Sequence, residues 1–336
     1  MRKLATIETI TAIKPHPNAD QLELAQVRGW QVVVKKGEFV PGDPCVYCEI
    51  DSVLPEREAF EFLRKSKFRI RTIRLRGEIS QGIALPVNEA FRGVPQSEYT
   101  TVKTGDDVTE LLGVTLYQKP VPMALWGEIE GAFPAFIPKT DEERIQNCAF
   151  ILEKYRQLEW VATEKLDGSS VTYFIKDGMF GACSRNWQLT DTPYNLYWQM
   201  ARQLELPEKM ARYGKNFALQ GELLGHKVQG NPYRLPSHQV RFFSLYWIDE
   251  HRYGDHHELT GICRILDLDR VPTIHYGDVL PATLEETLRT AEGRSDIGDT
   301  EREGLVYRPL TEHTDPVLGR LSFKAISNRF LLSRKD

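Results

Sequence analysis

The chain has 336 residues, 41% of them apolar and 27% charged, so it is long enough for two domains with cores of their own. This composition excludes disordered and fibrous proteins. The formal net charge is only -4, so any affinity for nucleic acid must come from a local basic patch.

The N-terminal sequence MRKLATIETI lacks the apolar run of a signal peptide, and nothing downstream approaches the roughly 20 apolar residues of a membrane span. The five cysteines are an odd number, which fits a reducing compartment. We therefore expect a cytoplasmic enzyme with no membrane partner. No obligate protein partner is evident.

Residues 1 to about 120 contain short apolar runs separated by glycine and proline, such as 31–35 and 45–53. This spacing predicts a small all-β barrel or sandwich. The pair Cys45 and Cys48 stands in one of these runs, where residues three apart point to opposite faces of a strand. Since no second pair exists to complete a zinc site, we expect no metal or redox role for it.

The stretch His16-Pro17-Asn18-Ala19-Asp20, followed by Val-Pro-Gly-Asp at 40–43, resembles the OB-type tRNA-binding modules of some synthetases and free-standing proteins. The resemblance implies an OB fold for this part of the chain.

Residues 64–76 contain seven cations and no acid. The alternation predicts a basic strand with Lys67, Arg69 and Arg71 on one face and Phe68 and Ile70 on the other, and with a bend or bulge before its end. A solvated barrel face is one interpretation, but an unpaired cluster of cations more often meets phosphate. We favour contact with nucleic acid, through Lys67, Arg69, Arg71, Arg74 and Arg76.

Pro120-Val121-Pro122 indicates a linker, which divides the chain into residues 1–120 and 121–336. Beyond it, Thr140 and Glu143 have the spacing of a capping box, and Asp191-Thr192-Pro193 also indicates a helix start. The strands expected between and after these helices are 161–163, 170–175, 217–223, 240–248, 303–308 and 321–325. The mixture of helices and antiparallel strands indicates the α+β class.

Residues 164–170 read Glu-Lys-Leu-Asp-Gly-Ser-Ser, which places Lys165 beside Asp167 and Gly168. A lysine nucleophile must be neutral, yet an unperturbed lysine is deprotonated only at a few parts in about ten thousand at pH 7. Burial, a divalent metal or a second cation would lower its pKa, whereas a close anion such as Asp167 would not. Gly168 allows a tight turn beside a nucleotide. Such a tetrad alone is a weak signal.

An ordered set of further segments follows this tetrad. They are Ser184-Arg185-Asn186, Gly221-Glu222-Leu223, residues 241–246, Glu303-Gly304-Leu305-Val306-Tyr307-Arg308 and Ser322-Phe323-Lys324-Ala325. The tetrad and these five segments, in this order, resemble motifs I, Ia, III, IIIa, IV and V of the covalent nucleotidyl transferases. This superfamily contains DNA ligases, RNA ligases and capping enzymes. Residues 69–82, 136–147 and 225–231 resemble in particular the ATP-dependent RNA ligases with an OB domain in front of the transferase domain.

The resemblance implies a role for each motif residue. Lys165 would carry AMP from ATP, and Lys324 would neutralise the AMP phosphate as pyrophosphate leaves. Phe243 would stack on adenine, whereas Phe242, of opposite strand parity, belongs to the core. The implied nucleotide-binding set is Glu164, Lys165, Gly168, Arg185, Glu222, Phe243, Glu303 and Lys324. The implied catalytic set is Lys165, Asp167, Arg185, Glu222, Glu303 and Lys324. The implied ligands of Mg2+ or Mn2+, through water, are Asp167, Glu222 and Glu303.

The sequence departs from the family at one place, since many relatives have a lysine where Ser322 stands here, which leaves more of the phosphate work to Lys324. The chain ends twelve residues after Lys324, so we expect no OB domain at its C-terminal side and assign the nucleic-acid role to the N-terminal barrel.

The resemblance implies an ATP-dependent RNA ligase that acts through lysyl-AMP and an adenylated 5′ end. Its partner would be RNA or an RNA-containing nicked duplex, with RNA at the 3′-hydroxyl side. Two alternatives remain: an ATP-dependent DNA ligase and a nucleic-acid-binding protein without activity.

Overall fold

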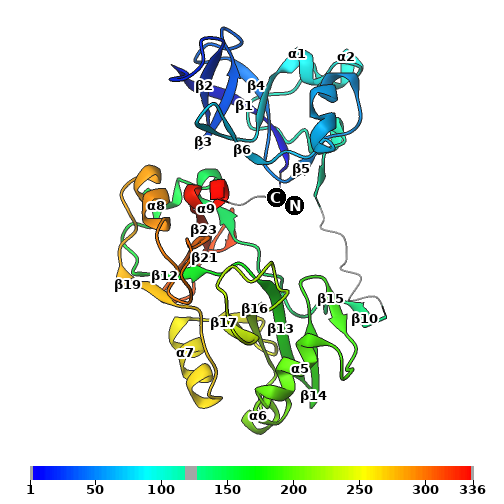
Figure 1. Ribbon diagram of the computed structural model, residues 1–336, viewed down its shortest axis with the longest axis vertical. Coiled ribbons are helices and arrows are strands. Elements are labelled where there is room, and N and C mark those ends of the chain that lie inside the picture. The colour runs from blue at the N-terminus through cyan, green and yellow to red at the C-terminus, as the bar shows by residue number, and fades with distance from the viewer. Residues whose placement is uncertain (1–2, 118–126, 334–336) are drawn as a thin grey trace. The chain divides into compact units, whose positions relative to one another are not determined.

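The computed structural model describes residues 3–117 and 127–333, which form two compact units on either side of residue 120 (Figure 1). We call them unit 1 and unit 2 and describe each by itself. The predicted linker Pro120-Val121-Pro122 lies outside the described residues.

Unit 1 is built on an antiparallel sheet. Within residues 3–117 its five strands pair in the order β3-β2-β1-β4-β8, with the bounds β1 Ala5–Pro15, β2 Leu22–Val27, β3 Trp30–Lys35, β4 Pro44–Cys48 and β8 Ile83–Pro86. Two short pairs accompany it, β6 Thr72–Leu75 with β7 Glu78–Gln81 and β5 Ser52–Val53 with β9 Thr115–Leu116. Short helical segments are η1 Glu58–Ser66, α1 Val87–Ala90, α2 Gln96–Tyr99 and α3 Thr109–Leu112. The all-β prediction for this part is confirmed.

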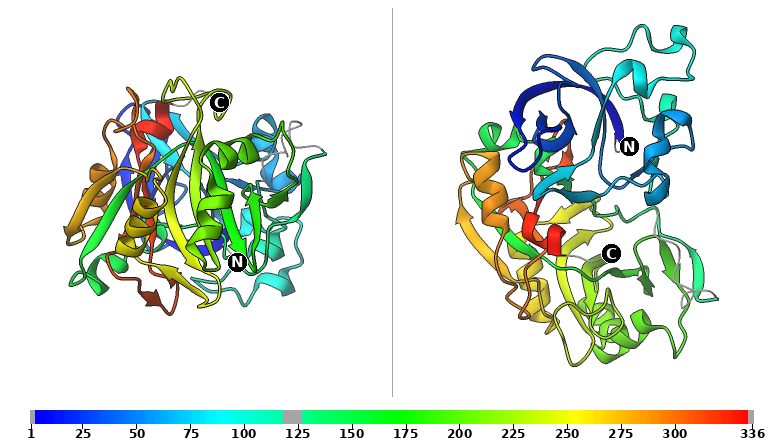
Figure 2. Two further views of the ribbon diagram at one scale, coloured as in Figure 1. Left: turned by 90° about the horizontal axis from the view of Figure 1, so that it is seen from below. Right: turned by 45° about the horizontal axis from the view of Figure 1, so that its top comes forward.

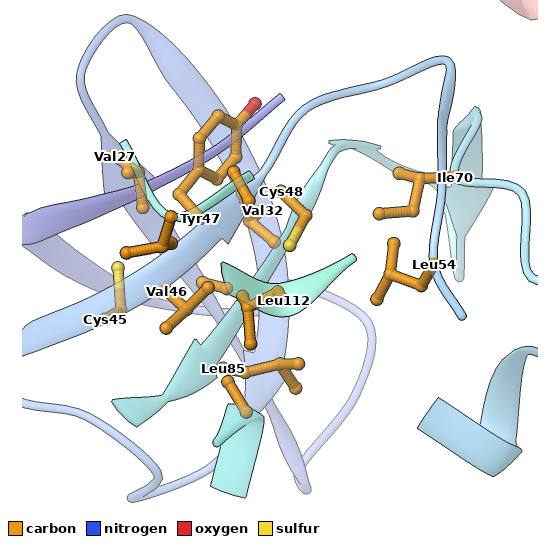
Figure 3. Packing of buried hydrophobic residues seen from close by; sticks show 14 of the residues in the cluster. Val27, Val32, Cys45, Val46, Tyr47, Cys48, Leu54, Ile70, Leu85 and Leu112 are labelled. Carbon is orange, nitrogen blue, oxygen red and sulfur yellow. The ribbon is translucent and has the colours of Figure 1, made fainter. Parts of the chain in front are cut away.

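The core of unit 1 is continuous from the sheet to the short helices, and Figure 3 shows part of it, with Leu54 next to Ile70. Tyr47 is fully buried, and its hydroxyl donates a hydrogen bond to the Gln81 carbonyl at 3.0 Å. Gly82, at φ +93°, lies so close that a Cβ atom there would be 2.5 Å from the Tyr47 ring. Only glycine fits this contact.

Cys45 and Cys48 are free thiols that are fully buried in this core. Burial raises the pKa of each to about 12, so both are protonated at neutral pH. They act as small apolar side chains.

The basic segment differs from its prediction as a strand. Arg64 and Lys65 belong to η1, and Lys67 and Phe68 adopt left-handed backbone conformations with φ of 54° and 59°. Strand structure begins only at Thr72. Phe68 and Ile70 are buried, but a left-handed turn and not a strand brings them to the core.

Unit 2 contains two main sheets. Within residues 127–333, seven strands form the large sheet in the order β10-β15-β14-β13-β16-β17-β18, with the bounds β10 Ile129–Ala132, β13 Ser169–Lys176, β14 Met179–Cys183, β15 Trp187–Leu189, β16 Phe217–Leu224, β17 Gln239–Trp247 and β18 Arg252–Gly254. Five more form the small sheet in the order β11-β23-β20-β12-β19, with the bounds β11 Glu143–Arg144, β12 Trp160–Lys165, β19 Thr273–Asp278, β20 Gly304–Pro309 and β23 Phe323–Ile326. The hairpin of β21 Thr314–Asp315 and β22 Gly319–Arg320 follows β20. Each of the six predicted strands has a counterpart, and the α+β class is confirmed.

Helices cover the outer face of each sheet (Figure 1, Figure 2). The large sheet packs against α5 Leu196–Gln203, α6 Leu206–Tyr213 and α7 His256–Ile265. The small sheet packs against η3 Ile145–Asn147, α4 Ile151–Lys154 and α8 Leu284–Ala291, and α9 Asn328–Ser333 ends the unit. None of the helices in the described residues is long and apolar enough to cross a membrane.

The inner faces of the two sheets meet through charged side chains. Arg308 of β20 donates to the Phe243 carbonyl at 3.3 Å and pairs with Glu142, while Arg320 donates to the Ser244 hydroxyl at 3.1 Å. Burial alone would raise the pKa of Glu142, but Arg308 and then Arg320 lower it to about 2. This buried network joins the two sheets of unit 2.

Both predicted helix starts are displaced. Residues 138–142 form no helix, and Glu143 begins the short strand β11, so the capping box is wrong. Helix α5 begins at Leu196, where the Asn195 side chain accepts hydrogen bonds from two backbone amides, and Thr192 instead accepts from the Asn195 amide.

Candidate active site

Lys165 ends β12 and meets a carboxylate from the neighbouring strand. Strand β12 pairs with β20 so that Lys165 lies opposite Gly304, and the Lys165 Nζ atom is 2.8 Å from Glu303 Oε2. Gly304, at φ +158°, has no room for a side chain, since a Cβ atom would lie 2.2 Å from the Ala325 carbonyl oxygen. The close packing of β20 against β23 therefore sets the position of Glu303.

The turn after Lys165 is fixed by two further contacts. The Gly168 amide donates to Glu222 Oε1 at 3.0 Å, and the Asp167 amide donates to the Tyr233 hydroxyl oxygen at 2.6 Å. A Cβ atom on Gly168 would lie 2.4 Å from the Leu223 carbonyl oxygen, so this turn requires glycine. The structure thus brings Lys165, Glu222 and Glu303 together around one turn.

The charges around Lys165 do not favour the neutral amine that a lysine nucleophile needs. Burial alone would lower the pKa of Lys165. The carboxylates of Glu303 and Glu222 raise this pKa by more than burial lowers it, so the net shift is upward. Burial also raises the pKa of Glu222 to about 8. With these groups alone around it, Lys165 is an ammonium. A neutral amine requires additional positive charge beside the carboxylates.

Two more predicted residues, Arg185 and Lys324, are joined by a carboxylate that the sequence did not single out. Asp141 Oδ1 is 3.3 Å from Lys324 Nζ, and Asp141 Oδ2 is 3.4 Å from Arg185 Nη2. Lys324 is only 18% exposed and its pKa is lowered, chiefly by burial, whereas Asp141 and Arg185 are 55% and 58% exposed. Asp141 thus bridges the two cations as an anionic phosphate could.

Phe243 lies at a β-bulge. Gln220 pairs with Ser244 and Gly221 with Phe242, so Phe243 is the additional residue of β17. It is partly exposed, and the Arg308 guanidinium carbon is 5.8 Å from its ring centroid. Phe242 is fully buried in the outer core of the large sheet, as its strand parity predicted.

Glu164 is placed apart from this group. Its side chain is 1% exposed, and its Oε2 atom accepts a hydrogen bond from the Asp296 amide at 2.9 Å. Alternation along β12 puts it on the face opposite Lys165. The Glu164 carboxylate therefore supports the loop that leads to Glu303.

The donor set fits a nucleotide with a hydrated divalent ion. Lys165, Lys324 and Arg185 supply positive charge for phosphate, and Glu222 and Glu303 supply carboxylates. In residues 3–117 and 127–333, no group of three or more His, Cys, Asp or Glu side chains is close enough to hold a metal ion directly.

Sequence reasoning missed Asp141 and Tyr233 as parts of the site. Asp141 lies in the segment 136–147, which resembles RNA ligases, and Tyr233 lies just after another such segment, 225–231. The sequence pattern assigned no role to either residue. Their partners are distant in sequence, since Asp141 meets Lys324 across 183 residues.

The predicted basic residues of unit 1 are not equivalent. Arg69 is 2.9 Å from Asp51 Oδ1, and its guanidinium carbon lies 3.7 Å from the Tyr117 ring centroid, so it supports the fold. Lys67, Arg71, Arg74 and Arg76 are exposed. These four residues form what we call the basic surface.

Comparison with known proteins identifies both units. An OB-fold domain model matches residues 4–87, and the RNA ligase family model matches residues 158–326. No curated protein sequence matches the chain.

The chain is also similar to solved structures of Naegleria gruberi RNA ligase. It is 38% identical to a mutant with ATP and Mn, over 100% of both chains and with a TM-score of 0.89. It is 39% identical to the form with PPi, over 98% of both chains and with a TM-score of 0.87. An apo mutant is 39% identical, with a TM-score of 0.87 over 98% of this chain and 97% of that one.

These matches confirm the predicted branch, in which an OB-fold domain precedes the catalytic domain. The chain belongs to the RNA ligase family.

Proposed function

We propose that this RNA ligase seals RNA ends in three steps, of which the first consumes ATP, with Lys165 as the covalent nucleophile. The observation that carries the proposal is the position of Lys165, 2.8 Å from Glu303 Oε2 on a turn that Glu222 also holds. Solved structures of Naegleria gruberi RNA ligase contain ATP and Mn, AMP and Mn, or PPi. In the proposed reaction ATP is the substrate, a divalent ion such as Mn is the cofactor, pyrophosphate is the product of the first step and AMP that of the last.

In the first step, Lys165 Nζ bonds to the α-phosphorus of ATP, the bond to pyrophosphate breaks and the amine loses a proton. In the second, AMP passes from Lys165 to an RNA 5′-phosphate. In the third, an RNA 3′-hydroxyl attacks that phosphate and AMP leaves. Each step places negative charge beside the cations Lys324 and Arg185, which stabilise it.

We assign Mg2+ or Mn2+ to Asp167, Glu222 and Glu303, with contact through water. The ion supplies positive charge that favours the neutral amine of Lys165 and balances the phosphates. Glu303 then accepts the hydrogen bond that orients Lys165 Nζ. Phe243, displaced from the regular ladder by its bulge, is available to stack on adenine.

We assign the nucleic-acid role to residues 1–120 and adenylyl transfer to residues 121–336. The exposed cations of the basic surface support RNA binding by unit 1. The five free thiols support a cytoplasmic location.

The nucleophile can be tested with labelled ATP and a divalent metal. The wild type is expected to acquire covalent AMP and Lys165→Ala to acquire none, because the variant lacks the proposed nucleophile. Lys176→Ala, which removes a partly exposed lysine of β13, is the matched control and should label fully. Absence of label on the wild type would support the inactive nucleic-acid-binding alternative, and undiminished label on Lys165→Ala would exclude Lys165.

Asp141 should compete with ATP for Lys324 and Arg185. Exposed ion pairs contribute roughly 0.2–1 kcal/mol, so Asp141→Asn is expected to lower the KM for ATP in lysyl-AMP formation by about two- to fivefold. Asp177→Asn, an exposed carboxylate paired with Lys176, should leave KM unchanged. A higher KM in Asp141→Asn would mean that Asp141 assists ATP binding and does not compete with it.

Preference for RNA can be tested at nicks that differ only in the terminal 3′ sugar. A site that hydrogen-bonds the 2′-hydroxyl distinguishes RNA from DNA, so sealing should be about tenfold or more faster with 3′-ribose than with 3′-deoxyribose. Sealing on single-stranded RNA ends should be measured in parallel to test the template requirement. Equal rates with both sugars would favour the DNA ligase alternative.

The basic surface can be tested by replacing Arg71, Arg74 and Arg76 with alanine, while Arg69 is left intact because of its contacts with Asp51 and Tyr117. Lysyl-AMP formation should be unchanged, whereas RNA sealing should weaken. The slope of log affinity for RNA against log salt concentration should fall by roughly one unit per phosphate contact removed. The control replaces three other exposed lysines of unit 1, namely Lys35, Lys36 and Lys103. Equal loss of adenylation and sealing would show that these arginines support the fold instead.

A further inference from the structure

The stretch His16–Asp20 has a structural partner that the ligase chemistry does not explain. His16 follows β1 and is 6% exposed. Its Nε2 atom is 3.0 Å from the Leu75 carbonyl oxygen, and its Nδ1 atom accepts a hydrogen bond from the Asn18 amide at 3.1 Å. The Asn18 side-chain amide donates to the Arg76 carbonyl at 3.0 Å. Two residues of this stretch thus hold two successive carbonyls of the β6–β7 hairpin.

One form of the His16 ring satisfies both contacts. Because Nδ1 accepts from the Asn18 amide, the proton of the neutral ring is on Nε2, which donates to the Leu75 carbonyl. The ring therefore links the Asn18 backbone directly to the hairpin.

The turn that these residues hold is unusual. Leu75 pairs with Glu78, so Arg76 and Gly77 form a two-residue turn with φ of 46° and 99°. Both values are positive, as in a type I′ turn, where asparagine or glycine is preferred at the place of Arg76. A Cβ atom on Gly77 would lie 3.0 Å from Asn18 Nδ2, so the side chain of Asn18 packs closely on the turn. The contact with Asn18 supports a conformation that arginine adopts reluctantly.

This hairpin carries half of the basic surface. Arg74 and Arg76 are exposed, and Ile73 and Leu75 beside them are 46% and 36% exposed. The other strand of the hairpin is tied to β3, since Gln31 donates to the Ile79 carbonyl and the Val33 amide donates to the Ser80 hydroxyl, both at 3.0 Å. The base of the hairpin is thus anchored on the sheet, and the turn is anchored by His16 and Asn18.

We propose that His16 and Asn18 are positioning residues that lock the β6–β7 turn, so that Arg74 and Arg76 meet RNA phosphates on a preformed surface. The inference rests on the proposed role of the basic surface in RNA binding. A locked turn needs no ordering when RNA binds, and that ordering would otherwise reduce the affinity. Neither residue touches the RNA in this arrangement; each acts through the hairpin.

The test compares full-length variants in two measurements: the Kd for a labelled RNA oligonucleotide at several salt concentrations, and the rate of lysyl-AMP formation. Asn18→Ala and His16→Ala should bind RNA about three- to tenfold more weakly and form lysyl-AMP at the wild-type rate. His16→Gln, which can still donate to the Leu75 carbonyl, should recover part of the affinity. Gln21→Ala, which removes an exposed amide from the same loop, is the matched control and should bind as the wild type does.

A double-mutant comparison separates positioning from general stability. If the turn acts through its arginines, Asn18→Ala should weaken RNA binding much less when Arg74 and Arg76 are already alanine. Hydrogen exchange at the amides of residues 73–80 should also accelerate in Asn18→Ala. Wild-type affinity in both Asn18→Ala and His16→Ala would overturn the proposal, as would full additivity with the arginine replacements.

If the basic surface does not bind RNA at all, the measured Kd values follow a different pattern. If replacing Arg74 and Arg76 leaves the Kd for RNA unchanged, the hairpin is not an RNA contact and the positioning role is excluded with it. If those replacements weaken binding while the His16 and Asn18 variants do not, the hairpin binds RNA without needing these two residues.

Discussion

The ion pair between Lys165 and Glu303 is the interaction on which the active site depends. It exists because β12 and β20 pair in a register that puts Gly304 opposite Lys165, and because glycine alone allows β20 to approach β23 so closely. The same carboxylate that orients the amine raises its pKa, and Glu222 adds to this effect. The position of the proposed nucleophile is therefore built into the sheet, whereas its deprotonation requires positive charge, which the proposed divalent ion would supply.

Charges in unit 2 are balanced in two different ways. Between the sheets, Glu142 and Arg308 are buried, and the pKa of Glu142 is lowered to about 2, so removing either partner would leave an uncompensated buried charge. At Lys324 and Arg185, the counter-ion is Asp141, which is 55% exposed and whose Oδ1 atom lies 3.3 Å from Lys324 Nζ. This exposure makes Asp141 a weak and exchangeable partner. Since Asp141 and Glu142 are consecutive, one short segment serves both purposes. The buried pair holds this segment in place, and under the proposed function the exposed carboxylate gives way to phosphate.

Much of the fold, and the grouping of Lys165, Glu222 and Glu303 in the candidate site, could be predicted from the sequence, because both leave local signals. The strands around Lys165, Glu222 and Glu303 show apolar patterns, and the motifs occur in a fixed order. The errors came from places where tertiary contacts override local preference. Thr140 and Glu143 have the spacing of a capping box, but the segment between them is drawn to Lys324, Arg185 and Arg308 instead. The alternation correctly placed Phe68 and Ile70 on a common side, and both are buried, yet left-handed backbone at Lys67 and Phe68 replaced the expected strand.

Two sequence features acquired a physical meaning only from contacts distant in the chain. The stretch containing His16 and Asn18 indicated a fold, but its hydrogen bonds to Leu75 and Arg76 span 59 and 58 residues and could not be inferred from spacing. The same holds for Tyr233, whose hydroxyl supports Asp167 across 66 residues. In both cases a polar side chain fixes the backbone of a turn. One turn presents the arginines of the hairpin, and the other directly follows Lys165. The hairpin turn carries like charges whose mutual repulsion loosens it, so a contact from outside its own sequence is needed to hold it in one geometry.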